Sequence, residues 1–140
     1  MTKMTETQVQ EFLSRPLHSI VGTNSLDGFP QLSPVWYIYQ EDKIFFCITS
    51  DTSKYLNLKR DARISLCMDG GRSDVRAVMF QGMAQIVEDD AALIQEWRWA
   101  LIQHYSKSEE DAVRYEEETR DEDWILVIVT PDRIISQDFN

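Results

Sequence analysis

Hydrophobic residues gather in short runs along the chain, and several of these runs alternate with polar positions at the period of two that is typical of half-buried β-strands. Other runs are apolar on both faces: the run from Ile44 to Ile48 contains no polar residue. Turn residues such as Asp69-Gly70-Gly71 separate the runs. The pattern predicts seven strands, over residues 18–23, 32–39, 43–49, 64–68, 75–87, 124–130 and 133–137.

Four segments carry helix signals instead. The first opens with Thr5-Glu6-Thr7-Gln8, a capping box followed by an apolar stripe at helical spacing, and it is expected to stop near Pro16. A short helix follows over Thr52 to Arg60. Two longer ones are expected from Ala91 to Tyr105, capped by Asp89 or Asp90, and from Ser108 to about Thr119.

Turns, rather than helices, join most of the predicted strands, which favours an antiparallel sheet. Residues 40–42 would join 32–39 to 43–49 as a hairpin, and Gly82 marks a candidate bend or bulge. The fold class expected is mainly β with flanking helices, as a barrel. Since 32–39 and 43–49 are apolar on both faces, we expect helices and a second subunit to cover the outside.

Length and composition narrow the classes of protein. The 140 residues, 43% of them hydrophobic, fit one domain over residues 1–140. The formal net charge of −10 argues against nucleic acid or an anionic membrane as the main partner. Cys47 and Cys67 lie in apolar runs without CxxC spacing, as expected for reduced, buried thiols. With no signal-peptide pattern and no membrane-length apolar segment, we expect a soluble cytoplasmic protein.

The segment Thr49-Ser50-Asp51-Thr52-Ser53-Lys54 carries the candidate chemistry. It leaves an apolar strand and opens a helix, so hydroxyls and free backbone N–H groups gather at one place. Lys54 adds a positive charge in the first turn, where a cation opposes the helix dipole. A bound phosphate would reverse that sign. An ordinary Ser/Thr cap beside a solvated lysine is the alternative interpretation.

The chain around this segment resembles the pyridoxamine-phosphate-oxidase-like family of FMN-binding split barrels. The similar stretches, in the family's order, are Ile20-Val21-Gly22-Thr23, Leu32-Ser33-Pro34-Val35-Trp36-Tyr37, Ile44-Phe45-Phe46, Thr52 to Leu58, Arg60 to Leu66, and Gln81-Gly82-Met83-Ala84. They cover more than half of the chain. The resemblance implies a split β-barrel that binds FMN and works as a homodimer.

The resemblance also implies roles for individual residues. Lys54, with Ser53 and Thr52, would hold the FMN phosphate, while Thr49 and Ser50 would lie under the ribityl chain and the ring edge. The residues implied for the isoalloxazine ring are Ser33, Val35, Trp36 and, through its backbone, Ile48. Because the family's site lies between subunits, Arg76 and Gln81 would reach the cofactor from the other chain. Alternatively, Arg76 pairs with Asp74 or Glu88.

Two features restrict the activity. The chain ends Pro131 to Asn140 without a histidine, whereas the family's true pyridoxine-phosphate oxidases carry an Arg- and His-bearing segment there, so vitamin B6 phosphate oxidation is not expected. Ala62 stands where the family commonly has proline. The only histidines, His18 and His104, have no metal-ligand spacing, and no hydrolase triad is evident.

Two further segments have structural interpretations. In Trp97-Arg98-Trp99, one tryptophan is expected to pack on the barrel, and the other would meet a partner, the site or solvent. The acidic run from Glu116 to Asp123 is interpreted as a solvated face. The function expected is that of an FMN-dependent oxidoreductase acting on an unknown small molecule. A deazaflavin-dependent reductase of the same architecture and a non-catalytic flavin- or haem-binding module are the alternatives.

Overall fold

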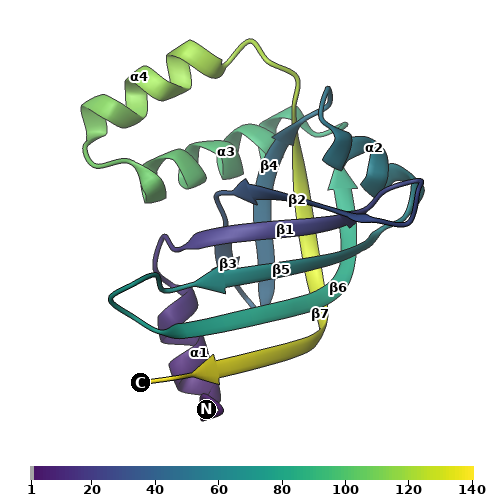
Figure 1. The fold of residues 1–140 in the computed structure, drawn as a ribbon. Helices are drawn as coiled ribbons and strands as arrows, with labels where there is room; N and C mark the ends of the chain where they lie inside the picture. Colours follow the sequence, from purple (N-terminus) through teal and green to yellow (C-terminus); the bar gives the residue numbers. More distant parts are fainter. Residues whose placement is uncertain (1) are drawn as a thin grey trace.

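The computed structural model describes residues 2–140, which form four helices and one seven-stranded sheet (Figure 1). The helices are α1 (Glu6–Leu13), α2 (Ser53–Arg60), α3 (Ala91–Tyr105) and α4 (Glu109–Thr119). The strands are β1 (His18–Asn24), β2 (Pro30–Val35), β3 (Ile38–Gln40), β4 (Lys43–Thr49), β5 (Arg63–Asp69), β6 (Arg76–Val87) and β7 (Trp124–Asp138).

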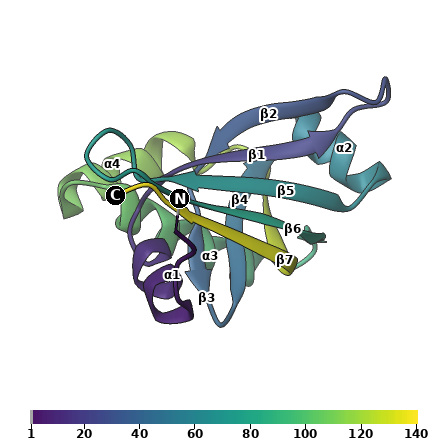
Figure 2. The same ribbon diagram turned by 60° about the horizontal axis from the view of Figure 1, so that its bottom comes forward.

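The sheet is antiparallel throughout and curls on itself, with the strand order β2-β1-β5-β6-β7-β4-β3 (Figures 1 and 2). β2 and β3 are consecutive in the chain but lie at opposite edges of the sheet. Only Trp36 and Tyr37 connect them, so the two edges approach each other at this connection. The predicted class, mainly β with flanking helices, is confirmed as a split half-barrel.

The prediction of one strand over 32–39 is wrong. The chain leaves β2 after Val35, and only β3 pairs with β4. Tyr37 explains the break: it is fully buried, and its hydroxyl donates to the carbonyls of Leu13 and Arg15 at 3.1 Å each. These bonds to the end of α1 pull the chain off the line of β2. The hairpin connection itself is confirmed, with Glu41 and Asp42 at φ 53° and 61° in a tight turn.

The two closing strands predicted over 124–130 and 133–137 are one strand, β7, which pairs with β6 along its length. The register shifts between Gln81 and Gly82, leaving Asp132 as the extra residue of a bulge. Pro131, which has no N–H to donate, is tolerated beside the bulge. A Cβ at position 82 would lie 2.2 Å from the carbonyl oxygen of Thr130, so the predicted irregularity at Gly82 is confirmed and requires glycine.

The main core fills the inside of the curled sheet, and α1 seals one end of it. The predicted capping box of α1 is present: the Thr5 N–H donates to the Gln8 side chain at 2.9 Å, and the Gln8 N–H donates to the Thr5 hydroxyl at 3.2 Å. The fully buried large side chains are Phe12, Leu13, Val21, Tyr37, Ile44, Phe46, Met68, Val78, Phe80, Ile102, Ile125 and Leu126.

A second, smaller core lies where α3 packs on the outer face of β4 and β7. The ring of Trp97 stacks on Phe45 with centroids 3.9 Å apart and planes within 2°, which confirms that one of the two neighbouring tryptophans packs on the sheet. Asp90 is the residue that caps α3. Within residues 2–140, no helix lies over the outer face of β1, β5 and β6 (Figure 1). Across residues 2–140, every helix is too short or too polar to cross a membrane.

Candidate functional site

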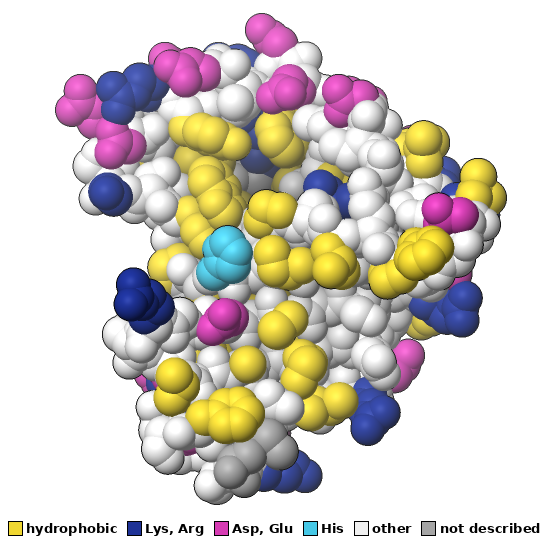
Figure 3. Space-filling view, viewed as in Figure 1, with side chains coloured by type: hydrophobic (Ala, Val, Ile, Leu, Met, Phe, Trp, Pro, Cys, Tyr) yellow, Lys and Arg dark blue, Asp and Glu magenta, His cyan; other side chains and the backbone are white. Residues whose placement is uncertain are grey.

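A cavity of about 630 Å³ lies between the sheet and the two long helices, a size in the usual range for small-molecule sites. Figure 3 shows this region as a hollow beneath α3 and α4 in which apolar side chains gather. Its lining comes from the start of β1, the β2–β3 connection, the end of β4, the start of α2 and both helices: Pro16, Leu17, His18, Ser19, Pro34, Val35, Trp36, Cys47, Ile48, Thr49, Thr52, Lys54, Arg98, Leu101, Ile102, Tyr105, Tyr115 and Trp124.

The strand-to-helix corner expected from the sequence forms one side of this cavity. β4 ends at Thr49 and α2 begins at Ser53, with Thr52 as the N-cap residue. The Thr52 hydroxyl donates to the Thr49 carbonyl at 2.8 Å and accepts from the Tyr55 N–H at 3.4 Å. Cap and strand end are thus locked together, which fixes the direction in which α2 leaves the sheet.

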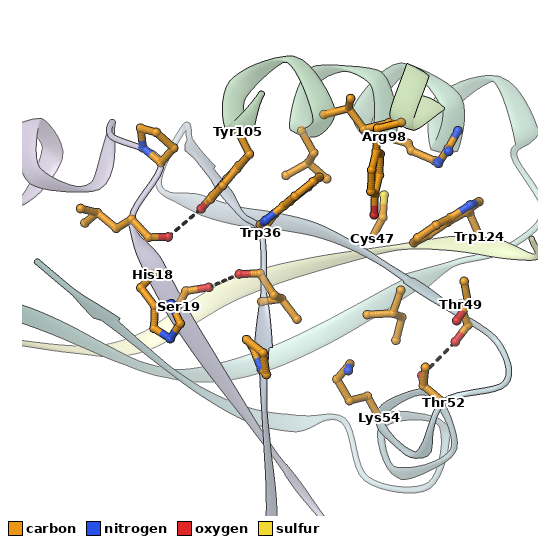
Figure 4. Close-up of a pocket in the computed structure, with 18 residues that line it drawn as sticks. His18, Ser19, Trp36, Cys47, Thr49, Thr52, Lys54, Arg98, Tyr105 and Trp124 are labelled. Carbon is orange, nitrogen blue, oxygen red and sulfur yellow. Dashed lines mark hydrogen bonds between the residues drawn. The ribbon is translucent and has the colours of Figure 1, made fainter. Parts of the chain in front are cut away.

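Lys54 lies half-buried at this corner, across the cavity from Trp36 and Trp124 (Figure 4). Burial lowers the pKa of its ammonium group from the ordinary value. No carboxylate of residues 2–140 lies within ion-pair distance of it. A partly desolvated cation near a helix start, with no counter-charge, is a favourable partner for an anion.

Two further hydroxyls of the segment, those of Thr49 and Ser50, already have protein acceptors. Thr49 donates to the Asp51 carboxylate at 2.6 Å, and Ser50 donates to Asp123 at 2.6 Å. The Ser50 N–H also donates to the Asp123 carbonyl at 3.0 Å. The two bonds from Ser50 to Asp123 tie the corner to the segment before β7. Because both hydroxyls already donate, Thr49 and Ser50 can accept further hydrogen bonds but have no proton left to donate.

An aromatic contact forms the opposite side of the cavity. Trp36 lies between Tyr105 of α3 and Tyr115 of α4: the Tyr105 ring stacks on it at 5.2 Å and 11°, and the Tyr115 ring meets it at 5.1 Å and 45°. Tyr105 is held in turn, because its hydroxyl donates to the Leu17 carbonyl at 2.8 Å. Residues from the β2–β3 connection and both helices therefore meet around one indole ring.

Arg98 of α3 is a buried cation, only 3% exposed, on the side of the cavity that the two long helices form, which we call the roof. Its guanidinium donates to the Glu116 carboxylate at 2.8 Å and lies 5.0 Å from the centre of the Trp124 ring. Beneath it, burial raises the pKa of the Cys47 thiol to about 12, with a small opposing effect of Arg98. Cys47 is therefore a protonated thiol at neutral pH.

The cavity contains six of the residues singled out from the sequence: Val35, Trp36, Ile48, Thr49, Thr52 and Lys54. Ser50 and Ser53 lie beside it on the same corner without lining it. Ser33 lies on β2, and its buried hydroxyl oxygen has no hydrogen-bond partner among residues 2–140.

Arg76 and Gln81 lie on β6, outside this cavity. Arg76 pairs with Asp74 at 2.6 Å, which is one of the two alternatives considered from the sequence, and it lies over the Phe12 ring at 4.9 Å. Gln81 lines a separate hollow on the outer face, together with Arg63 and Arg133. Neither residue reaches the cavity of its own chain.

Several residues that line the cavity were not predicted from the sequence. Arg98, Tyr105, Tyr115, Trp124 and Cys47 line the cavity but were not singled out as site residues. One signal was available for Arg98, because it occupies the same helical face as Ile94, Leu101 and Ile102, where an arginine must be buried with a partner. Tyr115 gave no comparable signal in its acidic helix.

The charge of the lining contrasts with that of the whole chain. Although the protein carries a formal charge of −10, the lining has two cations, Lys54 and Arg98, and no aspartate or glutamate. No cluster of metal-ligating side chains occurs within residues 2–140. The cavity can thus hold a flat, largely apolar molecule that carries negative charge at the Lys54 end.

Comparison with known proteins gives the same architecture. The solved structure of a conserved hypothetical protein from Mycobacterium tuberculosis is 23% identical, with a TM-score of 0.79 over 96% of this chain and 85% of that one. An F420 reductase is 20% identical, with a TM-score of 0.69 over 89% and 94%. A FAD-binding protein from Mesorhizobium loti is 11% identical, with a TM-score of 0.71 over 96% and 95%. At these identities the likeness shows the fold alone.

The curated proteins contain no match to this sequence. A family model does match, and it spans nearly the whole chain: the pyridoxamine 5'-phosphate oxidase model aligns with residues 5–138. The family expected from the motifs around Lys54 is therefore confirmed, and this chain belongs to the pyridoxamine 5'-phosphate oxidase family of split barrels.

Proposed function

We propose that this protein binds FMN in the cavity beneath α3 and α4 and acts as an oxidoreductase on a small molecule. One observation carries the proposal: Lys54 is a half-buried cation without a counter-charge within residues 2–140, at the edge of an aromatic cavity that contains no carboxylate side chain. A cofactor with a phosphate at one end and a flat ring at the other matches that distribution of charge.

The residues present fit FMN in chemistry. Lys54 and the N–H groups at the start of α2 would hold the phosphate, with Thr52 fixing the start of the helix. Val35, Ile48 and Trp36 provide apolar and aromatic surface for the ring system. The orphaned hydroxyl of Ser33 is a nearby polar group on β2 that lacks a partner within residues 2–140.

Bound FMN would supply the hydride or electron transfer, which explains why no acid–base pair stands out in the lining. The chain itself supplies binding and exclusion of water. One side of the cavity is enclosed by Leu101 and Ile102 of α3 and by the stacked rings of Trp36 and Tyr105. Arg98 and Trp124 fix the roof, and the raised pKa keeps Cys47 uncharged beside the site.

Titration of the purified protein with FMN, followed by flavin absorbance and fluorescence, tests this proposal. We expect binding at one site per chain, weakened about tenfold to a hundredfold in Lys54→Ala, because a hydrogen bond to a charged group contributes about 1.5–3 kcal/mol. Lys59→Ala is the matched control, since Lys59 lies on the same helix but pairs with Glu88. Equal FMN affinity in wild type and Lys54→Ala would sink the proposal.

A deazaflavin is the second candidate cofactor, favoured by the likeness to the F420 reductase and by Lys54, a cation of the lining without a counter-charge within residues 2–140. The surface of α4 opposes it, because Glu109, Glu110 and Asp111 open that helix and would repel a polyanionic tail. Competition between FMN and the deazaflavin for the same protein separates the two. A haem-binding role would rely on His18, the one histidine in the lining, and would give a Soret band.

The functional unit proposed is a homodimer. One cross-strand row on the uncovered outer face is apolar over five strands, running through Pro34, Ile20, Cys67, Met79 and Ile135. Leu32 and Met83, also on strands of this face, are 66% and 48% exposed. An apolar sheet face of this kind is a feature of subunit interfaces. A second copy on it would also bring Gln81 to the interface.

Light scattering on the purified protein tests the dimer. We expect twice the mass of one chain for the wild type and a shift to the monomer mass for Met79→Asp, which adds a charge to the centre of the apolar row. Glu117→Ala, on the exposed face of α4, serves as the control. A monomeric wild type at micromolar concentration would contradict the proposal.

A further inference from the structure

Five hydroxyl groups line the cavity, and four of them already donate hydrogen bonds to protein acceptors. Ser19 donates to the Val35 carbonyl at 2.6 Å and Tyr105 to the Leu17 carbonyl at 2.8 Å. Thr49 donates to Asp51, and Thr52 donates to the Thr49 carbonyl. The fifth, Tyr115, has no hydrogen-bond acceptor anywhere in residues 2–140.

The position of Tyr115 is fixed although its hydroxyl is unused. Its ring contacts Trp36 at 5.1 Å, and the next residue, Glu116, is anchored to the buried guanidinium of Arg98 at 2.8 Å. Tyr115 is also 37% exposed, so a molecule in the cavity can reach it. A rigidly placed donor without a partner is what a binding site uses to select an acceptor atom.

The surroundings indicate which acceptor is selected. Beside Tyr115 the lining is aromatic and apolar, formed by Trp36, Leu101 and Ile102, and the nearby Cys47 is an uncharged thiol. The indole N–H of Trp36 also lacks an acceptor within residues 2–140. The charge of Arg98 is offset by Glu116. Such an environment favours a flat, uncharged molecule that carries carbonyl oxygens over a second anion.

We propose that Tyr115 determines specificity in this cavity by donating a hydrogen bond to a carbonyl oxygen of a planar conjugated ligand, the chemical class to which quinones belong. This inference rests on the proposed function and deepens it, since such a compound would be the small molecule that the same site recognises. The Lys54 end of the cavity then recognises its ligand by charge, and the Tyr115 end recognises its ligand by a hydrogen bond from an uncharged donor.

Two flat probes of similar size test the inference by equilibrium dialysis: duroquinone, and durene, which carries the same four methyl groups on a six-membered ring without the oxygens. Because duroquinone is fully methylated, it offers no open carbon for addition of the two thiols. We expect the ratio of duroquinone to durene affinity to be higher in the wild type than in Tyr115→Phe. Tyr115→Phe should weaken duroquinone binding about fivefold to tenfold, as expected for one hydrogen bond, and leave durene binding unchanged.

Tyr105→Phe is the matched control, because its hydroxyl faces the same cavity but serves Leu17, and it should leave the ratio of duroquinone to durene affinity as in the wild type. Unchanged durene binding also shows that the cavity of Tyr115→Phe is intact. Equal duroquinone affinity in wild type and Tyr115→Phe, or no duroquinone binding, would each overturn the inference. Both probes are measured on FMN-loaded and on flavin-free protein, so that a failure to bind duroquinone is distinguished from a failure to bind FMN.

Discussion

Arg98 of α3 and Glu116 of α4 form an ion pair of 2.8 Å that is almost completely buried, with 3% and 13% of their side chains exposed. The same guanidinium lies over the Trp124 ring and donates to the Thr119 hydroxyl. Trp124 in turn donates its indole N–H to the Thr119 carbonyl at 2.7 Å. One arginine thus fastens the end of α4 to α3 and to the start of β7, and through Glu116 it fixes the neighbouring Tyr115.

Glu116→Ala should therefore destabilise the fold strongly, because it leaves the Arg98 charge buried without a partner. Removing one member of a buried pair typically costs about 3–5 kcal/mol. Urea unfolding followed by tryptophan fluorescence gives the free energy of unfolding, and Glu117→Ala, whose side chain is exposed on the same helix, should change it by less than about 0.5 kcal/mol. Equal losses in the two variants would mean that the pair is not structurally important.

Acid should weaken the attachment of α1 to the sheet through Asp74. Hydrogen bonds from Arg76 and Arg15, at 2.6 and 2.8 Å, hold the pKa of this carboxyl well below its usual range. Because the folded pKa is depressed, the stabilisation is fully present above the unfolded pKa of about 3.9 and is lost as the pH falls through the lower folded pKa.

Urea midpoints measured from pH 7 down to about pH 2, into the range between the unfolded and the folded pKa, check this expectation. The wild type should lose stability steeply in the acid range, and Asp74→Asn should start lower at pH 7 and show a flatter acid limb. Asp132→Asn is the control, since Asp132 is an exposed carboxyl without an ion pair in residues 2–140. Parallel acid limbs in wild type and Asp74→Asn would contradict the role given to this carboxyl.

The features predicted well from the sequence are those that depend on nearby residues. The capping box needs only Thr5 and Gln8, and the tight turn after Gln40 needs only Glu41 and Asp42. A glycine in a strand interior predicts an irregularity at Gly82, and the bulge lies there. The strand-to-helix corner at Lys54 belongs to the same class, since strand, cap and cation are contiguous.

The features that were missed depend on contacts between distant residues. The break after Val35 is set by bonds from Tyr37 to carbonyls more than twenty positions earlier. Continuity of β7 past Pro131 depends on β6, which tolerates the extra residue at its bulge. The aromatic contact beside the cavity joins Trp36, Tyr105 and Tyr115 from three elements, and no local sequence pattern predicts that these residues meet.

Gly82→Ala should be among the most damaging single-methyl changes in this chain. The added Cβ would lie 2.2 Å from the Thr130 oxygen and 3.0 Å from the Pro131 Cα, and both are backbone atoms that cannot rotate away. Overpacking of this kind costs about 1–3 kcal/mol or more. The measurement is again the free energy of unfolding in urea, with Gln85→Ala as the neighbouring control because Gln85 is an exposed polar side chain on the same strand. An unchanged midpoint for Gly82→Ala would show that the bulge relaxes freely.

Cys47 should resist thiol reagents although it lines the cavity. Burial raises its pKa to about 12, so at pH 8 about one thiol in ten thousand is ionised, compared with about a quarter of an unperturbed thiol. In a Cys67→Ser variant, which isolates Cys47, Ellman's reagent should react at least about a hundredfold more slowly with folded protein than with protein unfolded in urea. The reciprocal Cys47→Ser variant reports on Cys67, whose pKa burial also raises. A folded-state rate for Cys47 close to the unfolded one would mean that the thiol is ionised in the cavity, and the uncharged surroundings assigned to the ligand of Tyr115 would then be wrong.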